Sequence, residues 1–189
     1  MQNELWAKAW VQELGDKDLT NARVGGRATK ANPQKEDVNF WQATGPQWVQ
    51  AYIDWRKANP AWKLWKTPQG VPAIELAMLP KFAGVPVKMI LDRVFEVNGE
   101  LVIVDLKTSQ QTPTNTLQLG FYKVGILKTF GIDVKWGTYW MARQHGVSPL
   151  VSLSNTQRIK LSTLLQDLTR LVRLESFYLT QTTANINVD

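Results

Sequence analysis

The sequence predicts an α/β protein of the α+β type, with a mixed central sheet of about four strands (αβββαβ) flanked by helices. First, residues 85–107 place Asn98-Gly99 between two runs rich in Val, Ile, Leu and Phe, which is typical of a β-hairpin. Second, a helical pattern over residues 115–130 separates this hairpin from an apolar strand at residues 134–141, and that spacing indicates a parallel pair of strands. Third, amphipathic helices precede and follow these elements, which adds helices at both ends of the core.

Two helices are expected ahead of the sheet. Residues 4–14 place tryptophan, leucine and alanine at helical spacing, and a Gly-Asp pair ends the pattern. A second helix is expected over residues 44–59, with Thr44 or Gly45 as its cap and Pro46 in its first turn. An Asn-Pro pair ends this second pattern, because the residue before a proline disfavours helical backbone.

Two other N-terminal segments do not fit a helix. Residues 15–39 are polar, rich in turn formers and basic, and we interpret them as a loop. Residues 61–70 interleave tryptophan with lysine, which suits either a nucleic-acid contact or an edge strand whose lysines extend into solvent. Residues 74–79 are expected to form a strand that carries one acid, Glu75, in an apolar setting.

The whole chain, residues 1–189, is expected to form a single domain. Its parts would be a helical and loop-rich N-terminal part (1–70), a core (71–145) and a C-terminal helix (155–178). Hydrophobic residues at 44% and charged residues at 20% describe a globular rather than a disordered chain. No apolar run is long enough to span a membrane, and the N-terminus lacks the basic start of a secretory signal, so we expect a cytoplasmic protein with no membrane partner.

Composition narrows the chemistry that the chain can carry. It contains no cysteine, which excludes disulfides, cysteine zinc sites, cysteine-bound iron–sulfur clusters and thiol nucleophiles. Its one histidine, His145, follows a predicted strand in a turn-like setting and is interpreted as a surface residue. Catalysis would therefore depend on carboxylates, lysine and a hard metal ion. The net charge of +6 suits a polyanionic partner.

The predicted hairpin brings charged residues together at one end. If Asn98 and Gly99 form its two-residue loop, Asp92 lies opposite Asp105. The period of two along a strand then puts Lys107 on the same face as Asp105. Like charges that face each other destabilise a sheet, and a divalent cation would offset their repulsion.

The same residues also allow an interpretation without a site. Asp92 would pair with Arg93 or with a distant basic residue, and Asp105 and Lys107 would mark the solvated end of a strand. Hairpin geometry alone does not choose between the two interpretations.

The helix that follows the hairpin supplies the next polar pair. Thr114 or Asn115 is expected to cap it, and Gly131 is expected to end it. Gln118 and Tyr122 are four residues apart and share one face of this helix. Its apolar stripe is expected to consist of Leu117, Phe121, Val124 and Leu127.

Three motifs occur in order within this frame: LDRV at residues 91–94, IVDLKT at residues 103–108 and QLGFY at residues 118–122. In order, spacing and structural setting they resemble the RecB-like branch of the PD-(D/E)xK nuclease superfamily, and most of all its small stand-alone exonucleases, including those of bacteriophages. The resemblance implies a restriction-endonuclease-like core.

The resemblance also implies a role for each matching residue. Asp92 and Asp105 would bind Mg²⁺ or Mn²⁺ together with the Leu106 carbonyl, and Lys107 would orient or help to deprotonate the attacking water. Gln118 and Tyr122 would hold the substrate strand or the lysine. The alternative for this last pair is a buried Gln-Tyr contact that only ties the helix to the sheet.

The sequence departs from the family pattern upstream of the hairpin. Members of this branch usually carry a histidine or a glutamate on a helix ahead of the sheet as another metal ligand, and no histidine precedes His145. Glu75 would either point into the site as that ligand or pair with a surface lysine. The C-terminal cysteine cluster of the iron–sulfur relatives is absent, so no such cluster is expected.

The resulting expectation is a metal-dependent DNA nuclease, an exonuclease of recombination, repair or phage DNA metabolism, in the cytoplasm of a bacterium or a phage-infected host. The alternatives are a catalytically impaired DNA-binding accessory protein of the same fold, or a structural protein with a fortuitous hairpin. Partners considered beyond DNA are a second copy of the chain and a recombination or replication protein. DNA contacts are expected from Arg93, Thr108, Ser109, Lys123, Arg27 and Lys30.

Overall fold

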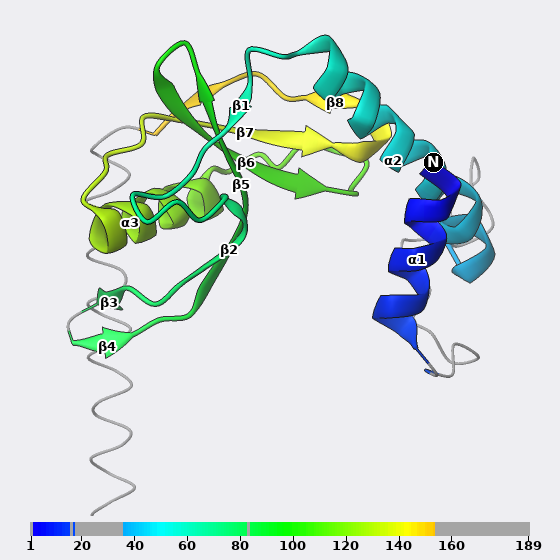
Figure 1. Cartoon of the computed structure of the whole chain (residues 1–189), viewed down its shortest axis with the longest axis horizontal. Coiled ribbons are helices and arrows are strands. Elements are labelled where there is room, and N and C mark those ends of the chain that lie inside the picture. Colours follow the sequence, from blue (N-terminus) through cyan, green and yellow to red (C-terminus); the bar gives the residue numbers. More distant parts are fainter. Residues whose placement is uncertain (1, 16, 18–35, 83, 154–189) are drawn as a thin grey trace, which may run out of the picture. The chain divides into compact units, whose positions relative to one another are not determined.

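The computed structural model describes residues 2–15, 17, 36–82 and 84–153 (Figure 1). The chain divides into two compact units, one made of Met1–Pro60 with Ala142–Gly146 and the other of Ala61–Met141 with Val147–Asp189. The helix predicted at residues 155–178 lies outside the described residues. That the whole chain forms one domain stays a prediction.

The first unit contains α1 (Gln2–Leu14) and α2 (Val38–Ala58). The predicted start of the second helix at Thr44 was wrong, because Asp37 caps the helix earlier: its side chain accepts a hydrogen bond from the Phe40 N–H at 2.8 Å. Pro46 therefore lies inside α2. The predicted end is confirmed, since Asn59 is the C-cap and its N–H donates to the Trp55 carbonyl.

Aromatic side chains pack this unit. A Cβ atom at Gly45 of α2 would overlap the ring of Trp6 on α1, so the glycine is what lets the ring lie against the helix. A short 3₁₀ helix, η1 (Ala142–Gln144), adds Arg143, which pairs with Glu36 at 2.7 Å. The Arg143 guanidinium lies 5.1 Å from the centre of the Trp48 ring, within cation–π range.

The second unit is built on a sheet whose main path has the order β1-β5-β6-β7 (Figure 1). Strand β2 also pairs with β5, β9 pairs with β7, and β3 and β4 form a small ribbon of their own. The predicted mixed sheet is confirmed. Of the two interpretations of residues 61–70, the structure shows the edge strand, β1. The strands are β1 (Lys63–Leu64), β2 (Ile74–Met78), β3 (Lys81–Phe82), β4 (Val85–Pro86), β5 (Met89–Val97), β6 (Glu100–Lys107), β7 (Trp136–Met141), β8 (Gly146–Val147) and β9 (Val151–Ser152).

The β5–β6 hairpin has the register that its turn predicts. Asn98 has a φ of 52° and Gly99 a φ of 80°, so both turn residues adopt the left-handed conformation that a tight two-residue hairpin turn requires. Antiparallel pairing then runs from Val97↔Glu100 to Arg93↔Val104. Strand β7 lies parallel to β6, from Val102↔Trp136 to Lys107↔Met141, which confirms the parallel pair predicted from the helix between them.

Helix α3 (Leu117–Phe130) connects β6 to β7 and packs against β2, β5 and β6. Gly131 ends it in the left-handed conformation, as predicted. The predicted cap and apolar stripe were partly wrong: Thr116 is the N-cap, although the Asn115 side chain accepts from the Leu117 N–H at 3.3 Å, and Leu117 is exposed. The residues of α3 that are buried are Leu119, Gly120, Lys123, Val124, Gly125 and Ile126.

No helix in the part of the chain that the structure describes combines the length and the apolar character needed to cross a membrane.

Candidate active site

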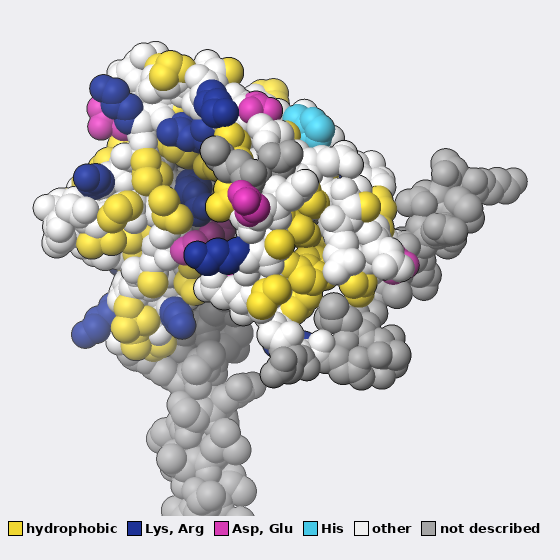
Figure 2. Space-filling model, turned by 45° about the vertical axis from the view of Figure 1, so that its right-hand side comes forward, with side chains coloured by type: hydrophobic (Ala, Val, Ile, Leu, Met, Phe, Trp, Pro, Cys, Tyr) yellow, Lys and Arg dark blue, Asp and Glu magenta, His cyan; other side chains and the backbone are white. Residues whose placement is uncertain are grey.

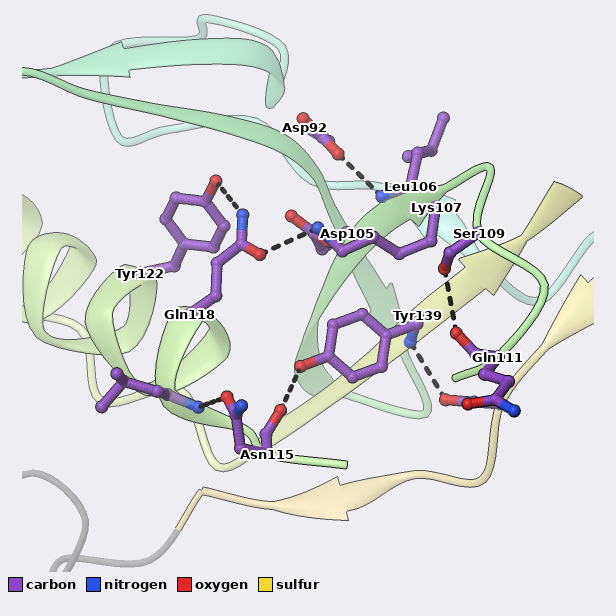
Figure 3. A network of polar contacts seen from close by, with 12 residues as sticks. Asp92, Asp105, Leu106, Lys107, Ser109, Gln111, Asn115, Gln118, Tyr122 and Tyr139 are labelled. Atoms are coloured by element: carbon purple, nitrogen blue, oxygen red, sulfur yellow. Dashed lines mark hydrogen bonds and ion pairs between the residues drawn. The ribbon is translucent and has the colours of Figure 1, made fainter. Parts of the chain in front are cut away.

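Asp92 lies at the open end of the β5–β6 hairpin. Pairing of the two strands reaches Arg93↔Val104, so the next residues along the strands are Asp92 and Asp105. The Asp92 carboxylate accepts a hydrogen bond from the backbone N–H of Leu106 at 2.7 Å (Figure 3). This bond holds the Asp92 carboxylate against β6. In a regular antiparallel ladder, a backbone carbonyl of β5 would accept from this N–H instead.

Asp105 is the buried member of the pair. Its Oδ2 lies 2.6 Å from the Lys107 Nζ as an ion pair, and among the described residues this oxygen accepts no well-aligned hydrogen bond. Burial raises the pKa of Asp105; Lys107 opposes that shift, and the charge of Asp92 adds to it. The structure therefore combines two neighbouring carboxylates with a buried oxygen whose cationic partner, Lys107, lies close but makes no well-aligned hydrogen bond to it.

Lys107 is held from the other side by α3. Its Nζ donates to the Gln118 Oε1 at 2.8 Å, and the Gln118 Nε2 donates to the Tyr122 hydroxyl at 3.0 Å (Figure 3). Because the Gln118 amide accepts at its oxygen and donates at its nitrogen, both of its ends are in use. The Tyr122 oxygen is an acceptor in this chain, which leaves the phenolic proton available to another acceptor.

Tyr122 is neutral in this environment. Burial raises the pKa of its phenol, and the charges of Asp105 and Asp92 raise it further, while the Gln118 hydrogen bond opposes the shift. The predicted face shared by Gln118 and Tyr122 is confirmed. Through Gln118 the pair is linked to Lys107, the last residue of β6, and its role in holding the substrate strand or the lysine stays a prediction.

Tyr139 is part of the site and was missed by sequence reasoning. It lies on β7 as the register partner of Asp105, and its hydroxyl donates to the Asn115 carbonyl at 2.9 Å (Figure 3). Burial raises the pKa of this phenol, and the charge of Asp105 contributes. A tyrosine inside an otherwise apolar run carries no signal by itself; only the register of the parallel strands, which the sequence does not contain, points to it.

Glu75 and Arg93 interact with each other beside the aspartates. The Arg93 Nη1 lies 3.3 Å from the Glu75 Oε1 and donates to the Asp92 carbonyl at 2.6 Å. Glu75 is exposed and has a φ of 46°, in the left-handed region, between the paired residues Ile74 and Leu76. Its partner is thus an arginine rather than the surface lysine considered above, and its role as a metal ligand stays a prediction.

Lys123 does not fit the predicted contact with DNA. Its ammonium is buried, lies 3.0 Å from the Asp133 Oδ1 and donates to the Leu153 carbonyl at 2.7 Å. A phosphate cannot reach a group that is enclosed in this way, so this prediction was wrong. The apolar surroundings of Lys123 on α3 were the only warning in the sequence.

The other predicted DNA contacts are spread over the chain. Thr108 and Ser109 are exposed in the loop after β6, where the Ser109 hydroxyl donates to the Gln111 carbonyl at 2.9 Å. Arg27 and Lys30 lie outside the described residues. On the face drawn in Figure 2, lysine and arginine side chains stand in separate groups between apolar, acidic and uncharged ones. Among the described residues, the lysine and arginine side chains on that face therefore form no single continuous block.

The donor set at the open end of the hairpin suits a hard divalent cation. Two carboxylates, from Asp92 and Asp105, are what Mg²⁺ commonly uses in proteins, with waters and substrate oxygens completing its shell. The buried Asp105 oxygen without a well-aligned donor fits such an ion. Among the described residues, no three acidic or histidine side chains gather into a larger metal-binding group.

Comparison with known proteins identifies the family. The sequence model of the PD-(D/E)XK nuclease superfamily matches residues 2–179. The chain belongs to this superfamily. The resemblance inferred from the three motifs is thereby confirmed at the level of the superfamily, and the mixed sheet with its flanking helices is the fold that a PD-(D/E)XK protein is expected to have.

Two phage proteins resemble this PD-(D/E)XK protein in sequence. The "Gene 69 protein" of Mycobacterium phage D29 is 34% identical over 116 residues, which cover 61% of this chain and 42% of the relative. The "Gene 69 protein" of Mycobacterium phage L5 is 32% identical over 123 residues, with 54% of this chain and 42% of the relative covered. The chain thus spans less than half the length of the two relatives.

The crystal structure of a "Putative exonuclease" from Eubacterium rectale superposes on this chain with a TM-score of 0.49 at 11% sequence identity. The superposition covers 92% of this chain and 63% of that one.

Proposed function

We propose that this PD-(D/E)XK protein is a metal-dependent deoxyribonuclease of the RecB-like branch that hydrolyses phosphodiester bonds as an exonuclease. The observation that carries the proposal is the buried carboxylate of Asp105, which lies beside Asp92 and next to a lysine that α3 holds from its other side. The phage origin of the two sequence relatives supports a place for this reaction in phage DNA metabolism, and recombination or repair is part of the proposal.

In this proposal Asp92, Asp105 and the Leu106 carbonyl hold Mg²⁺ or Mn²⁺. When bound there, such an ion would supply a water of lowered pKa and would neutralise charge on the phosphate. Lys107 has a partly exposed side chain whose ammonium lies next to Asp105, which suits it to orient the attacking water or to take part in its deprotonation. Since the Gln118 oxygen accepts from Lys107, the amide restrains the lysine during this step.

Tyr122 contributes a hydrogen-bond donor. Its hydroxyl already accepts from Gln118, so its own proton can go to a phosphate oxygen of the substrate strand. The raised pKa of the phenol keeps it protonated at neutral pH, which is the state that donates. A Tyr122→Phe variant removes this donor and leaves Gln118 with its bond to Lys107.

Digestion assays test the proposal. Linear double-stranded, linear single-stranded and closed circular DNA are incubated with the protein in Mg²⁺, in Mn²⁺ and in EDTA. We expect linear DNA to be degraded with either metal, circular DNA to survive, and Asp105→Asn to abolish degradation. Asp133→Asn is the matched control, because Asp133 also forms an ion pair with a lysine, but with Lys123 and not with the candidate catalytic lysine. Cleavage of closed circular DNA, which has no ends, would mean that the protein is an endonuclease and not an exonuclease.

Calorimetric titration with Mn²⁺ separates the roles of the site residues. Asp92→Asn and Asp105→Asn are expected to weaken metal binding, while Lys107→Met is expected to leave it nearly intact. Equal losses in all three variants would contradict the separation of metal ligands from the lysine.

The second candidate is a DNA-binding accessory protein with impaired catalysis, and the lack of any histidine before His145 favours it. It predicts salt-dependent retention of DNA without cleavage, because contacts of lysine and arginine with phosphate weaken steeply as salt rises. A chain that does not bind DNA at low salt would overturn both candidates.

A further inference from the structure

Tyr139 connects the strand beside Asp105 to the start of α3. Its backbone is fixed on β7 by Ser148, whose N–H donates to the Tyr139 carbonyl at 2.8 Å and whose hydroxyl accepts from the Tyr139 N–H at 3.1 Å. Its ring is almost fully buried. The phenol therefore extends from a rigid base, and the position of its hydroxyl is set by the sheet.

That hydroxyl is bonded to the segment that leads into α3. It donates to the Asn115 carbonyl at 2.9 Å, and the Asn115 side chain in turn accepts from the Leu117 N–H at 3.3 Å (Figure 3). Gln118 follows directly, in the first turn of the helix. Asn115 is thus held by the sheet on one side and holds the first turn of α3 on the other.

The same first turn supplies the oxygen that restrains Lys107. Figure 3 shows Gln118 reaching from α3 toward Lys107, with Tyr139 between Asp105 and Asn115. A shift of the first turn would move the Gln118 oxygen away from its 2.8 Å contact with the lysine. Even small displacements of groups at a reacting centre lower the reaction rate strongly.

We infer that Tyr139 is a positioning residue, which fixes the first turn of α3 and so keeps the Gln118 oxygen in contact with the Lys107 ammonium. It acts through Asn115 and does not touch the substrate. The inference rests on the proposed function for its effect on rate, but its effect on the helix can be measured without any nuclease activity.

Tyr139→Phe tests the inference, because it keeps the ring and removes only the hydroxyl. Its kcat on linear DNA is expected to fall roughly tenfold with KM nearly unchanged. Thr67→Val is the control: it also removes a buried hydroxyl, one that accepts from the Val71 N–H at 3.2 Å in the loop between β1 and β2. Its kcat is expected to stay within about twofold of wild type. An equal fall in both variants would overturn the inference.

A double-mutant cycle distinguishes positioning from a general loss of structure. If Tyr139 acts through Gln118, Tyr139→Phe should lower kcat little further in a Gln118→Ala background, because the contact that it positions is already gone. If the fall in kcat of the double variant equals the product of the falls in the two single variants, Tyr139 and Gln118 act independently, and the inference is contradicted.

Hydrogen exchange provides the readout that does not depend on catalysis. The backbone amides of Leu117 and Gly120, which donate to the Asn115 side chain and to the Thr116 carbonyl, are expected to exchange roughly five- to tenfold faster in Tyr139→Phe than in wild type, and at the wild-type rate in Thr67→Val. Unchanged exchange in Tyr139→Phe would overturn the inference even in an active enzyme. If the wild-type protein fails to digest DNA while exchange rises as expected, the proposed function fails and the contact between Tyr139 and α3 stands.

Discussion

Lys107 and Lys123 have the same kind of partners but opposite burial. Lys107 lies 2.6 Å from an Asp105 oxygen and donates to the Gln118 amide, and Lys123 lies 3.0 Å from an Asp133 oxygen and donates to the Leu153 carbonyl. At the first pair the aspartate side chain is 2% exposed and the lysine 25%. At the second pair the lysine is 3% exposed and the aspartate 45%.

The difference shows which charge of a pair is available for chemistry. A buried carboxylate with a second carboxylate nearby favours a cation, and a partly exposed lysine beside it can reach a water or a phosphate. The buried Lys123 ammonium is bonded to a backbone carbonyl and to an exposed acid, so it has no such access. It ties α3 to Leu153, the residue after β9. The first pair suits a reaction and the second suits the fold.

The largest expected difference between the two lysines is in catalysis. Lys107→Met should lower the rate of DNA degradation by roughly 10²–10⁴-fold, the range found when a proton-transfer group is removed. Lys123→Met should leave the rate per folded molecule within about twofold, because its ammonium does not reach the site. Initial rates on linear DNA, corrected for the folded fraction from circular dichroism, measure both. Similar losses in the two variants would remove the distinction.

The order reverses for stability. Lys123→Met leaves the Leu153 carbonyl without its donor in a buried setting, which should lower the free energy of unfolding by roughly 1–3 kcal/mol. Lys107→Met should cost less, since the partners of a partly exposed lysine can turn to water. Urea denaturation of both variants in EDTA gives the comparison. A larger loss for Lys107→Met would mean that the first pair is also structural.

The pH dependence of stability follows from Asp105. Its pKa is raised above the ordinary value of 3.8, so between 3.8 and the raised value the folded state binds a proton that the unfolded state has lost. Stability therefore falls as pH rises through this window. Asp105→Asn should be more stable than wild type above the window in EDTA, and the difference should shrink as pH falls toward 3.8. Denaturation curves across pH test this; an Asn variant that is less stable at neutral pH would reverse the assigned sign.

The smallest effect is expected from Asp133→Asn. The aspartate is half exposed, and ion pairs of that kind contribute about 1 kcal/mol or less. The free energy of unfolding should therefore change little, and DNA degradation should be unaffected. If this variant lost as much stability as Lys123→Met, the ion pair, and not the hydrogen bond to Leu153, would be what holds the buried lysine.

Local signals in the sequence were enough to predict the frame of the site. Asn98 and Gly99 both tolerate the left-handed conformation, so the turn type and the register that puts Asp92 next to Asp105 follow from two residues. The parallel arrangement of β6 and β7 follows from the helix between them. Gln118 and Tyr122 share a face because of helical spacing alone.

Predictions failed where a distant contact or a competing local signal decided the outcome. Pro46 resembles a helix start, but Asp37 caps α2 earlier and the helix continues through the proline. Lys123 resembles a surface lysine, and only contacts with Asp133 and with Leu153, thirty positions further on, show that it is buried. The position of Tyr139 beside Asp105 depends on the same kind of long-range register.

The turn at Asn98 and Gly99 also divides the site along the chain. A polypeptide cut between these two residues would carry Asp92 on one fragment and Asp105 with Lys107 on the other. Each fragment would present a strand edge, β5 or β6, whose backbone groups only the other fragment satisfies in the native register. Such a split protein would regain its paired carboxylates only after the halves had met, which makes this turn a suitable point for a two-fragment reporter of association.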